Sequence, residues 1–182
     1  MKKNLKRIIF TSILAALGIT IPLFMPKIVI GDASYTLASH VPLFIAAFIG
    51  LDVTILVGMA TGAGFFLALT PIIAARAFSH LLWAIPLTLF LRKFPKYQEN
   101  IKYSVLLNIF IAFFHALFEV IVVLPFYGTK ISDLNWILTT LLLPIGLGGF
   151  VHSLVDFQIS FLIFGRIKDA LINANIIVDM VE

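Results

Sequence analysis

The chain has 182 residues, of which 61% are hydrophobic and only 12% are charged. A water-soluble domain carries about 25% charged residues, so the composition excludes an ordinary soluble domain and predicts a protein embedded in the lipid bilayer. The net charge of +4 does not indicate nucleic-acid binding, because the basic residues lie at the ends of apolar segments rather than in one cluster. The absence of cysteine excludes thiolate metal sites.

The apolar segments predict an all-α fold, a six-helix transmembrane bundle that forms a single integral membrane domain over residues 1–182. A helical span needs about 20 mostly apolar residues. The first segment exceeds the roughly 7–15 residues of a signal-peptide core, so we interpret it as a retained span. The expected spans are residues 8–25, 37–51, 53–69, 72–91, 103–126 and 147–167.

Residues 137–147 are apolar but make up only about half a span, and Pro144 lies among them. We therefore predict a short helical or re-entrant cap between the fifth and sixth spans rather than a seventh crossing.

The positions of the basic residues predict the orientation in the membrane. With the N-terminus in the cytoplasm, ten basic residues lie inside and only two, Lys27 and Lys130, lie outside. The inner ones are Lys2, Lys3, Lys6, Arg7, Arg92, Lys93, Lys96, Lys102, Arg166 and Lys168. This is a strong positive-inside bias. We expect a multi-pass protein of the cell membrane with both termini in the cytoplasm.

Ionisable residues within the predicted spans form pairs spaced by four residues, which places both members on one helix face. With the topology above, they all lie in the outer half of the bilayer or near its midplane. Each charge at a helix centre costs about 2.5–3.5 kcal/mol, so such groups face the bundle interior. The pairs are Arg76 with His80, His115 with Glu119, and His152 with Asp156, and His40 lies at the outer end of the second span.

Two interpretations of these residues remain open. An internal ion-pair network, such as Arg76 with Glu119 or Asp156, is one of them. A network needed only for folding has no reason to avoid the inner half of the bilayer, however, so we predict a substrate pocket that opens outward. Its expected lining is Tyr35, Thr36, His40, Arg76, His80, Trp83, His115, Glu119, His152 and Asp156.

Sequence motifs for nucleotide binding and hydrolysis are absent. The chain contains no G-x-x-x-x-G-K-[ST] loop, no H-E-x-x-H and no G-x-S-x-G. We expect a protein that is not an enzyme, with no catalytic residues, no cofactor and no resident metal ion. If ATP drives its transport, other subunits supply the energy.

The polar stretch of residues 31–42, the apolar residues 44–50 that follow it and the small residues of the first span resemble the substrate-binding S components of energy-coupling factor (ECF) vitamin transporters. The resemblance implies a vitamin site near the outer face, a transmembrane coupling subunit and two ATPase subunits. It also implies a coupling face on the first span, usually Ala-x-x-x-Ala. Here the nearest match is Ser12-x-x-x-Ala16, flanked by Ala15.

The substrate that best suits these residues is niacin. Arg76 and His80 can receive a carboxylate, and Trp83 or Tyr35 can stack on a flat ring. Glu119 and Asp156 would repel an anion unless they are paired or protonated. Cobalamin, pantothenate, folate and a pyrimidine are the alternative substrates.

Two other functions are kept as alternatives. Histidine and carboxylate groups at four-residue spacing also suit a proton- or metal-coupled secondary transporter. An intramembrane hydrolase could use His115, Glu119 and His152 around a metal ion.

Overall fold

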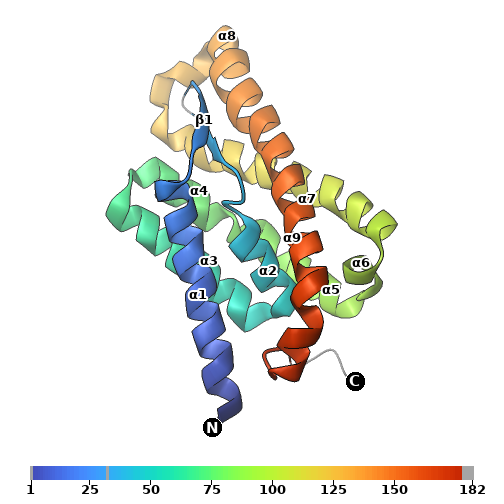
Figure 1. The fold of residues 1–182 in the computed structure, drawn as a ribbon. Coiled ribbons are helices and arrows are strands. Elements are labelled where there is room, and N and C mark those ends of the chain that lie inside the picture. Colours follow the sequence, from blue (N-terminus) through green and yellow to red (C-terminus); the bar gives the residue numbers. More distant parts are fainter. Residues whose placement is uncertain (1, 32, 178–182) are drawn as a thin grey trace.

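The computed structural model describes residues 2–31 and 33–177. Asp32 of the polar stretch lies outside the described residues, as do the side chains of Lys2 and Lys3, which contribute to the positive-inside count. The described chain is mostly helical, which confirms the all-α prediction, with one short β-hairpin added (Figure 1). The elements are α1 (Lys2–Phe24), β1 (Lys27–Ile30), β2 (Ala33–Thr36), α2 (Val41–Ile49), α3 (Leu51–Ala68), α4 (Pro71–Ser79), α5 (Leu81–Lys93), α6 (Lys96–Glu99), α7 (Ile101–Val123), η1 (Leu124–Phe126), η2 (Gly128–Ser132), α8 (Leu134–Trp136), η3 (Ile137–Gly148) and α9 (Gly149–Asn173).

Five helical stretches of the described chain are long and apolar enough to cross a membrane. They are Leu5–Phe24, Leu51–Ala68, Pro71–Lys93, Ile101–Phe126 and Leu134–Asn173. Five of the predicted spans overlap these stretches. Many of their large apolar side chains are exposed, as expected where lipid covers the protein.

The second predicted span, residues 37–51, is much shorter in the structure. Residues 37–40 form a turn, and α2 has only nine residues, all of them buried. At 1.5 Å per residue this helix is about 14 Å long, roughly half of the hydrocarbon core. Six membrane-length helices are therefore not confirmed. The apolar sequence of α2 has another explanation: the helix is buried inside the bundle on every side.

The predicted cap, residues 137–147, is not confirmed as a separate element. These residues form the π-helical segment η3, which joins α8 to α9 in one helical run of 40 residues. The wider π-helical turns accommodate Pro144, which has no N–H to donate. The Asp133 side chain accepts N–H groups of Asn135 and Trp136 and so caps the beginning of the run.

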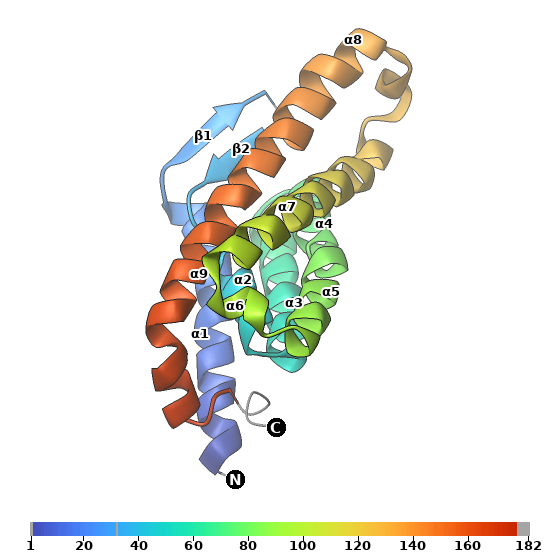
Figure 2. The ribbon, with the colours of Figure 1, turned by 90° about the vertical axis from the view of Figure 1, so that its right-hand side faces the viewer.

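The two ends of the bundle differ in what they carry. The beginning of α1 and the end of α9 lie at one end, and the hairpin and α8 lie toward the other (Figures 1 and 2). β1 and β2 pair antiparallel, with Lys27 opposite Thr36 and Ile30 opposite Ala33. This arrangement sets both described chain ends on the side opposite the hairpin. The orientation of the termini in a membrane stays a prediction.

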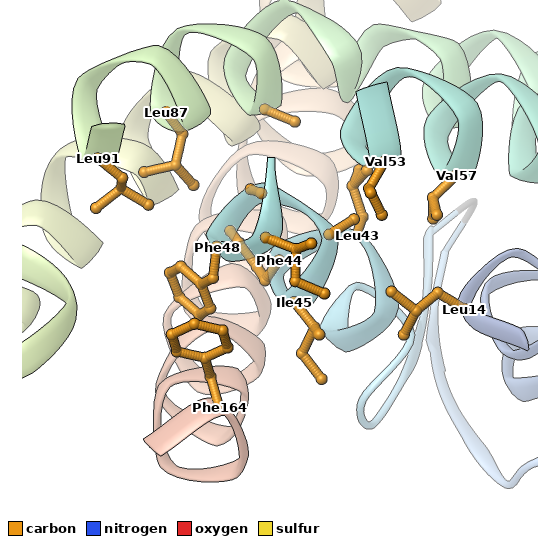
Figure 3. Packing of buried hydrophobic residues seen from close by; sticks show 14 of the residues in the cluster. Leu14, Leu43, Phe44, Ile45, Phe48, Val53, Val57, Leu87, Leu91 and Phe164 are labelled. Atoms are coloured by element: carbon orange, nitrogen blue, oxygen red, sulfur yellow. The ribbon is translucent and has the colours of Figure 1, made fainter. Parts of the chain in front are cut away.

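The main hydrophobic core surrounds α2. Phe44 and Phe48 of α2 pack against Phe157 and Phe164 of α9, with ring centroids 5.0–5.7 Å apart. Leucines of α5 and valines of α3 complete the cluster, as Figure 3 shows for Leu87, Leu91, Val53 and Val57. This core lies directly below the turn that carries His40 and so holds that turn in place.

Candidate functional site

A cavity of about 110 Å³ lies between the hairpin and the helices α1, α3, α4, α7 and α9. Its wall combines apolar residues, such as Leu43 and Phe65, with many polar ones. The polar lining residues are Lys27, Ser34, Thr36, Ser39, His40, Thr61, Arg76, His80, Glu119 and His152. The cavity is therefore a mixed site of the kind that binds a small polar molecule.

Six of the ten residues predicted to bind substrate line this cavity. They are Thr36, His40, Arg76, His80, Glu119 and His152. The other four lie outside its lining, in contact with residues that do line it: Tyr35, Trp83, His115 and Asp156. Their predicted contact with substrate stays a prediction.

Glu119 of α7 is the centre of the first polar cluster. Its Oε2 accepts a hydrogen bond from Arg76 of α4 at 2.9 Å, and its Oε1 lies 3.0 Å from Nε2 of His80. His115, one turn earlier on α7, places Nε2 3.7 Å from the same Oε1. The glutamate is 2% exposed, so these partners compensate for burying its charge.

Asp156 of α9 organises the second polar cluster. Its Oδ1 accepts the backbone N–H of Ala38 at 2.8 Å, and its Oδ2 accepts that of His40 at 2.9 Å. Nδ1 of His40 lies 3.1 Å from the same Oδ2, and Nε2 of His152 lies 3.4 Å from it. Ala38 has a φ of 68°, in the left-handed region that non-glycine residues rarely adopt. One buried carboxylate thus fixes the turn that carries His40.

The histidines bring the two clusters together. The His40 ring centroid lies 4.6 Å from that of His80, 4.7 Å from that of His115 and 4.9 Å from that of His152. Four histidines that are far apart in the sequence therefore lie around one point next to the cavity.

Tyr35 of β2 connects the hairpin to the long helical run. Its hydroxyl donates a hydrogen bond to the carbonyl oxygen of Pro144, and its ring lies 5.4 Å from that of His152. Burial raises the pKa of Tyr35 to about 12, so the hydroxyl remains a donor at any physiological pH. The hairpin is held over the cavity by this contact.

Trp83 lies in the apolar core below the histidines. Its side chain is 1% exposed, and its ring centroid is 4.7 Å from that of Phe44 and 5.7 Å from that of His115. Nε1 of Trp83 has no hydrogen-bond partner among the described residues. In this structure the Trp83 ring packs against the His115 ring on the side of the apolar core.

Four polar lining residues are not in the substrate-binding set expected from the sequence: Lys27, Ser34, Ser39 and Thr61. Ser34 and Ser39 belong to the polar stretch that the sequence analysis singled out, so the composition of that stretch was a usable signal. Thr61 is a single hydroxyl in an apolar helix, and Lys27 was interpreted only as an outer basic residue. No local pattern marked either of them.

The small residues predicted as a coupling face lie on the outside of α1. Ser12 and Ala16 are exposed, and Ala15 is partly buried. The Ser12 hydroxyl donates to the carbonyl oxygen of Ile8 at 3.0 Å, so it leaves no polar donor unpaired on that surface. This face is free to meet another helix in the described structure, while its role in coupling stays a prediction.

Comparison with known proteins shows a clear relative. The chain is 37% identical over 163 residues to the niacin transporter NiaX of Lactococcus lactis subsp. cremoris (strain MG1363), an alignment that covers 87% of this chain and 73% of the relative. No family model matches the chain. No solved structure matches it either.

Proposed function

Because the chain belongs to the family of NiaX, the S components of ECF vitamin transporters, we propose that it captures niacin at the outer face of the cell membrane for an ATP-driven importer. The 37% identity to a niacin transporter carries the choice of niacin. In this proposal a transmembrane coupling subunit and two ATPase subunits supply the energy, and this chain supplies the binding site.

Family membership also decides three broader predictions. The chain is an S component of vitamin uptake, it is a multi-pass protein of the cell membrane, and it is not an enzyme. Its relative is a transporter, which removes the basis for the intramembrane hydrolase considered above.

The cavity supports niacin as the ligand through Arg76. This cation lines the cavity with a side chain that is 13% exposed, and His80 lines the cavity beside it. A guanidinium offers several N–H donors, so Arg76 can pair with Glu119 and still donate to a substrate carboxylate.

Binding by the purified chain tests the choice of substrate. We expect niacin to bind, and nicotinamide, which has no carboxylate, to bind at least about tenfold more weakly, the effect of losing roughly 1.4 kcal/mol from one charged hydrogen bond. Arg76→Gln removes the cation and should abolish this preference, while Lys130→Gln, an exposed cation outside the cavity, should preserve it. Equal affinity of the wild-type chain for niacin and nicotinamide would contradict the role of Arg76. No niacin binding at all would contradict the substrate.

Reconstitution in liposomes tests the coupling. We expect uptake of labelled niacin only when the coupling subunit, both ATPases and ATP are present. Uptake by this chain alone under a proton or metal-ion gradient would instead establish the secondary transporter that the sequence left open.

A further inference from the structure

We propose that His80, His115, Glu119 and His40 bind a divalent metal ion of the zinc class at the base of the cavity. Three of the four ligand atoms form a compact triangle. Nε2 of His80 is 3.0 Å from Oε1 of Glu119 and 3.2 Å from Nε2 of His115, and the third side, from His115 to Glu119, is 3.7 Å. From the sequence we expected no resident metal ion, although the histidine and carboxylate pairs left metal-dependent functions open as alternatives.

The size of this triangle fits a tetrahedral zinc ion. Zinc binds imidazole nitrogen and carboxylate oxygen at about 2.0–2.2 Å, which makes each edge of the ligand tetrahedron about 3.3–3.5 Å. Two of the observed distances, 3.0 and 3.2 Å, are slightly shorter than this edge, and the third, 3.7 Å, is slightly longer. An ion can therefore approach all three atoms at bonding distance with only small side-chain movements.

Hydrogen bonds among these atoms satisfy the triangle only in part. A neutral imidazole has one N–H, and a given ring nitrogen carries either that proton or a lone pair. If Nε2 of His80 is protonated and donates to Glu119, then Nε2 of His115 either turns its lone pair toward the same carboxylate oxygen or places its own N–H against that of His80. If it is unprotonated, its own lone pair faces that oxygen. A cation at the centre removes the conflict because all three atoms then donate lone pairs to it.

His40 provides the fourth ligand and has a fixed tautomer. It offers a ring nitrogen within 4.8 Å of the other three ligand atoms. Its Nδ1 lies 3.1 Å from Asp156, whose carboxylate accepts the N–H and leaves Nε2 with a lone pair. A carboxylate behind a histidine ligand is the usual outer shell of a zinc site. Arg76 does the same for Glu119, because it pairs with Oε2 and leaves Oε1 for the ion.

The ion would also balance the charge of the pocket, a point that rests on the proposed function. With neutral imidazoles, as metal ligands require, the formal charges of the two polar clusters are +1 on the partly buried Arg76 and −1 each on Glu119 and Asp156, a sum of −1. Without an ion these two clusters oppose a substrate carboxylate, although the exposed Lys27 adds a further positive charge to the cavity wall. A divalent ion changes the sum to +1, which attracts one carboxylate. His40, His80 and Glu119 line the cavity, so the ion would face the substrate.

Metal analysis of the full-length chain, purified without an affinity tag, tests the site. After exposure to Zn²⁺ and removal of free ions, we expect one equivalent of zinc per chain. His115→Gln should lower zinc affinity at least about tenfold, the lower limit seen when even an outer-shell partner is lost. The matched control is His152→Gln, which changes a neighbouring histidine outside the ligand set and should retain zinc.

Several results would overturn the assignment. These are the absence of zinc from a monodisperse wild-type protein, or the loss of zinc in His152→Gln with retention in His115→Gln. Binding of Co²⁺ to the wild-type chain, followed by the visible absorption of a tetrahedral site, gives the same test without any substitution, and a spectrum typical of free hexahydrated cobalt would reject the site.

Niacin binding with and without a chelator separates this inference from the proposed function. We expect chelation to weaken niacin binding at least about tenfold (roughly 1.4 kcal/mol) and zinc to restore it. Equal niacin affinity in both states would reject the role of the ion in substrate binding and leave niacin as the substrate. Bound zinc without niacin binding in either state would reject niacin and leave the metal site standing.

Discussion

Two buried regions meet at α2 and differ in almost every respect. Next to the beginning of α2 lie four histidines, two carboxylates and one arginine. They are joined by hydrogen bonds and lie adjacent to the cavity. Around the helix itself lie phenylalanines, leucines and valines in a close-packed cluster (Figure 3). One short helix therefore contributes to both regions. The side chains of α2 form part of the apolar core, and the turn before α2 positions His40 in the site.

The largest effect should come from Glu119→Ala, which breaks the polar region. This change leaves the buried Arg76 without its carboxylate and His80 without its partner. Breaking a buried ion pair costs about 3–5 kcal/mol, so we expect a clear loss of thermal stability in detergent. Niacin binding should also be lost, because Arg76 is no longer held in position and the proposed ion loses a ligand. Glu119→Gln keeps an oxygen acceptor and should recover most of the stability without restoring niacin binding. Equal melting temperatures of wild type and Glu119→Ala would mean that the ion pair does not stabilise the bundle.

The apolar region is broken by Phe157→Ala. Phe157 is fully buried against Phe44 and Phe48, and removing such a ring costs about 3–5 kcal/mol. The chain should melt at a lower temperature but, where it is still folded, bind niacin with an affinity within a few-fold of wild type. Phe110→Ala, which changes an exposed phenylalanine of α7, is the matched control and should change neither quantity. A stable Phe157→Ala chain that no longer binds niacin would show that the two regions are not separable.

A smaller effect is expected where a hydroxyl pair crosses the apolar region. Oγ1 of Thr54 lies 2.9 Å from Oγ1 of Thr88, and both side chains are fully buried. Thr88→Val keeps the shape and removes the interhelical hydrogen bond, so stability should fall by about 0.6 kcal/mol, the average for such bonds between membrane helices. Chemical denaturation in mixed micelles measures this, with the exposed Thr139→Val as the control. A loss above about 3 kcal/mol would instead indicate an unsatisfied buried group.

The smallest effect on the isolated chain should come from Ala16→Leu on the outer face of α1. Because Ala16 is exposed, we expect unchanged stability and niacin binding. In the complete transporter the larger side chain should prevent close helix packing and reduce niacin uptake at least about tenfold. Leu17→Phe changes an exposed neighbour on the same helix without filling the small-residue face. Full uptake by Ala16→Leu would place the coupling face elsewhere.

Composition and hydropathy were enough to predict that the protein is embedded in the lipid bilayer. Five of the six predicted spans overlap helices of membrane length. The four-residue spacing of the pairs Arg76–His80, His115–Glu119 and His152–Asp156 also predicted which side chains share a helix face. These features are local, because an apolar run and a helical repeat each act within one segment of chain. The sequence therefore carries them without knowledge of the neighbours.

Only the tertiary structure decided which polar residues meet and what shape α2 takes. Glu119 pairs with Arg76 and His80, whereas Asp156 contacts Ala38, His40 and His152. The equal four-residue spacing of the pairs in the sequence could not distinguish these partners. The length of α2 was overestimated because a helix buried on all sides is as apolar as one that faces lipid. Contacts between segments far apart in the chain determine both results, since burial and partner choice depend on the packing of whole helices.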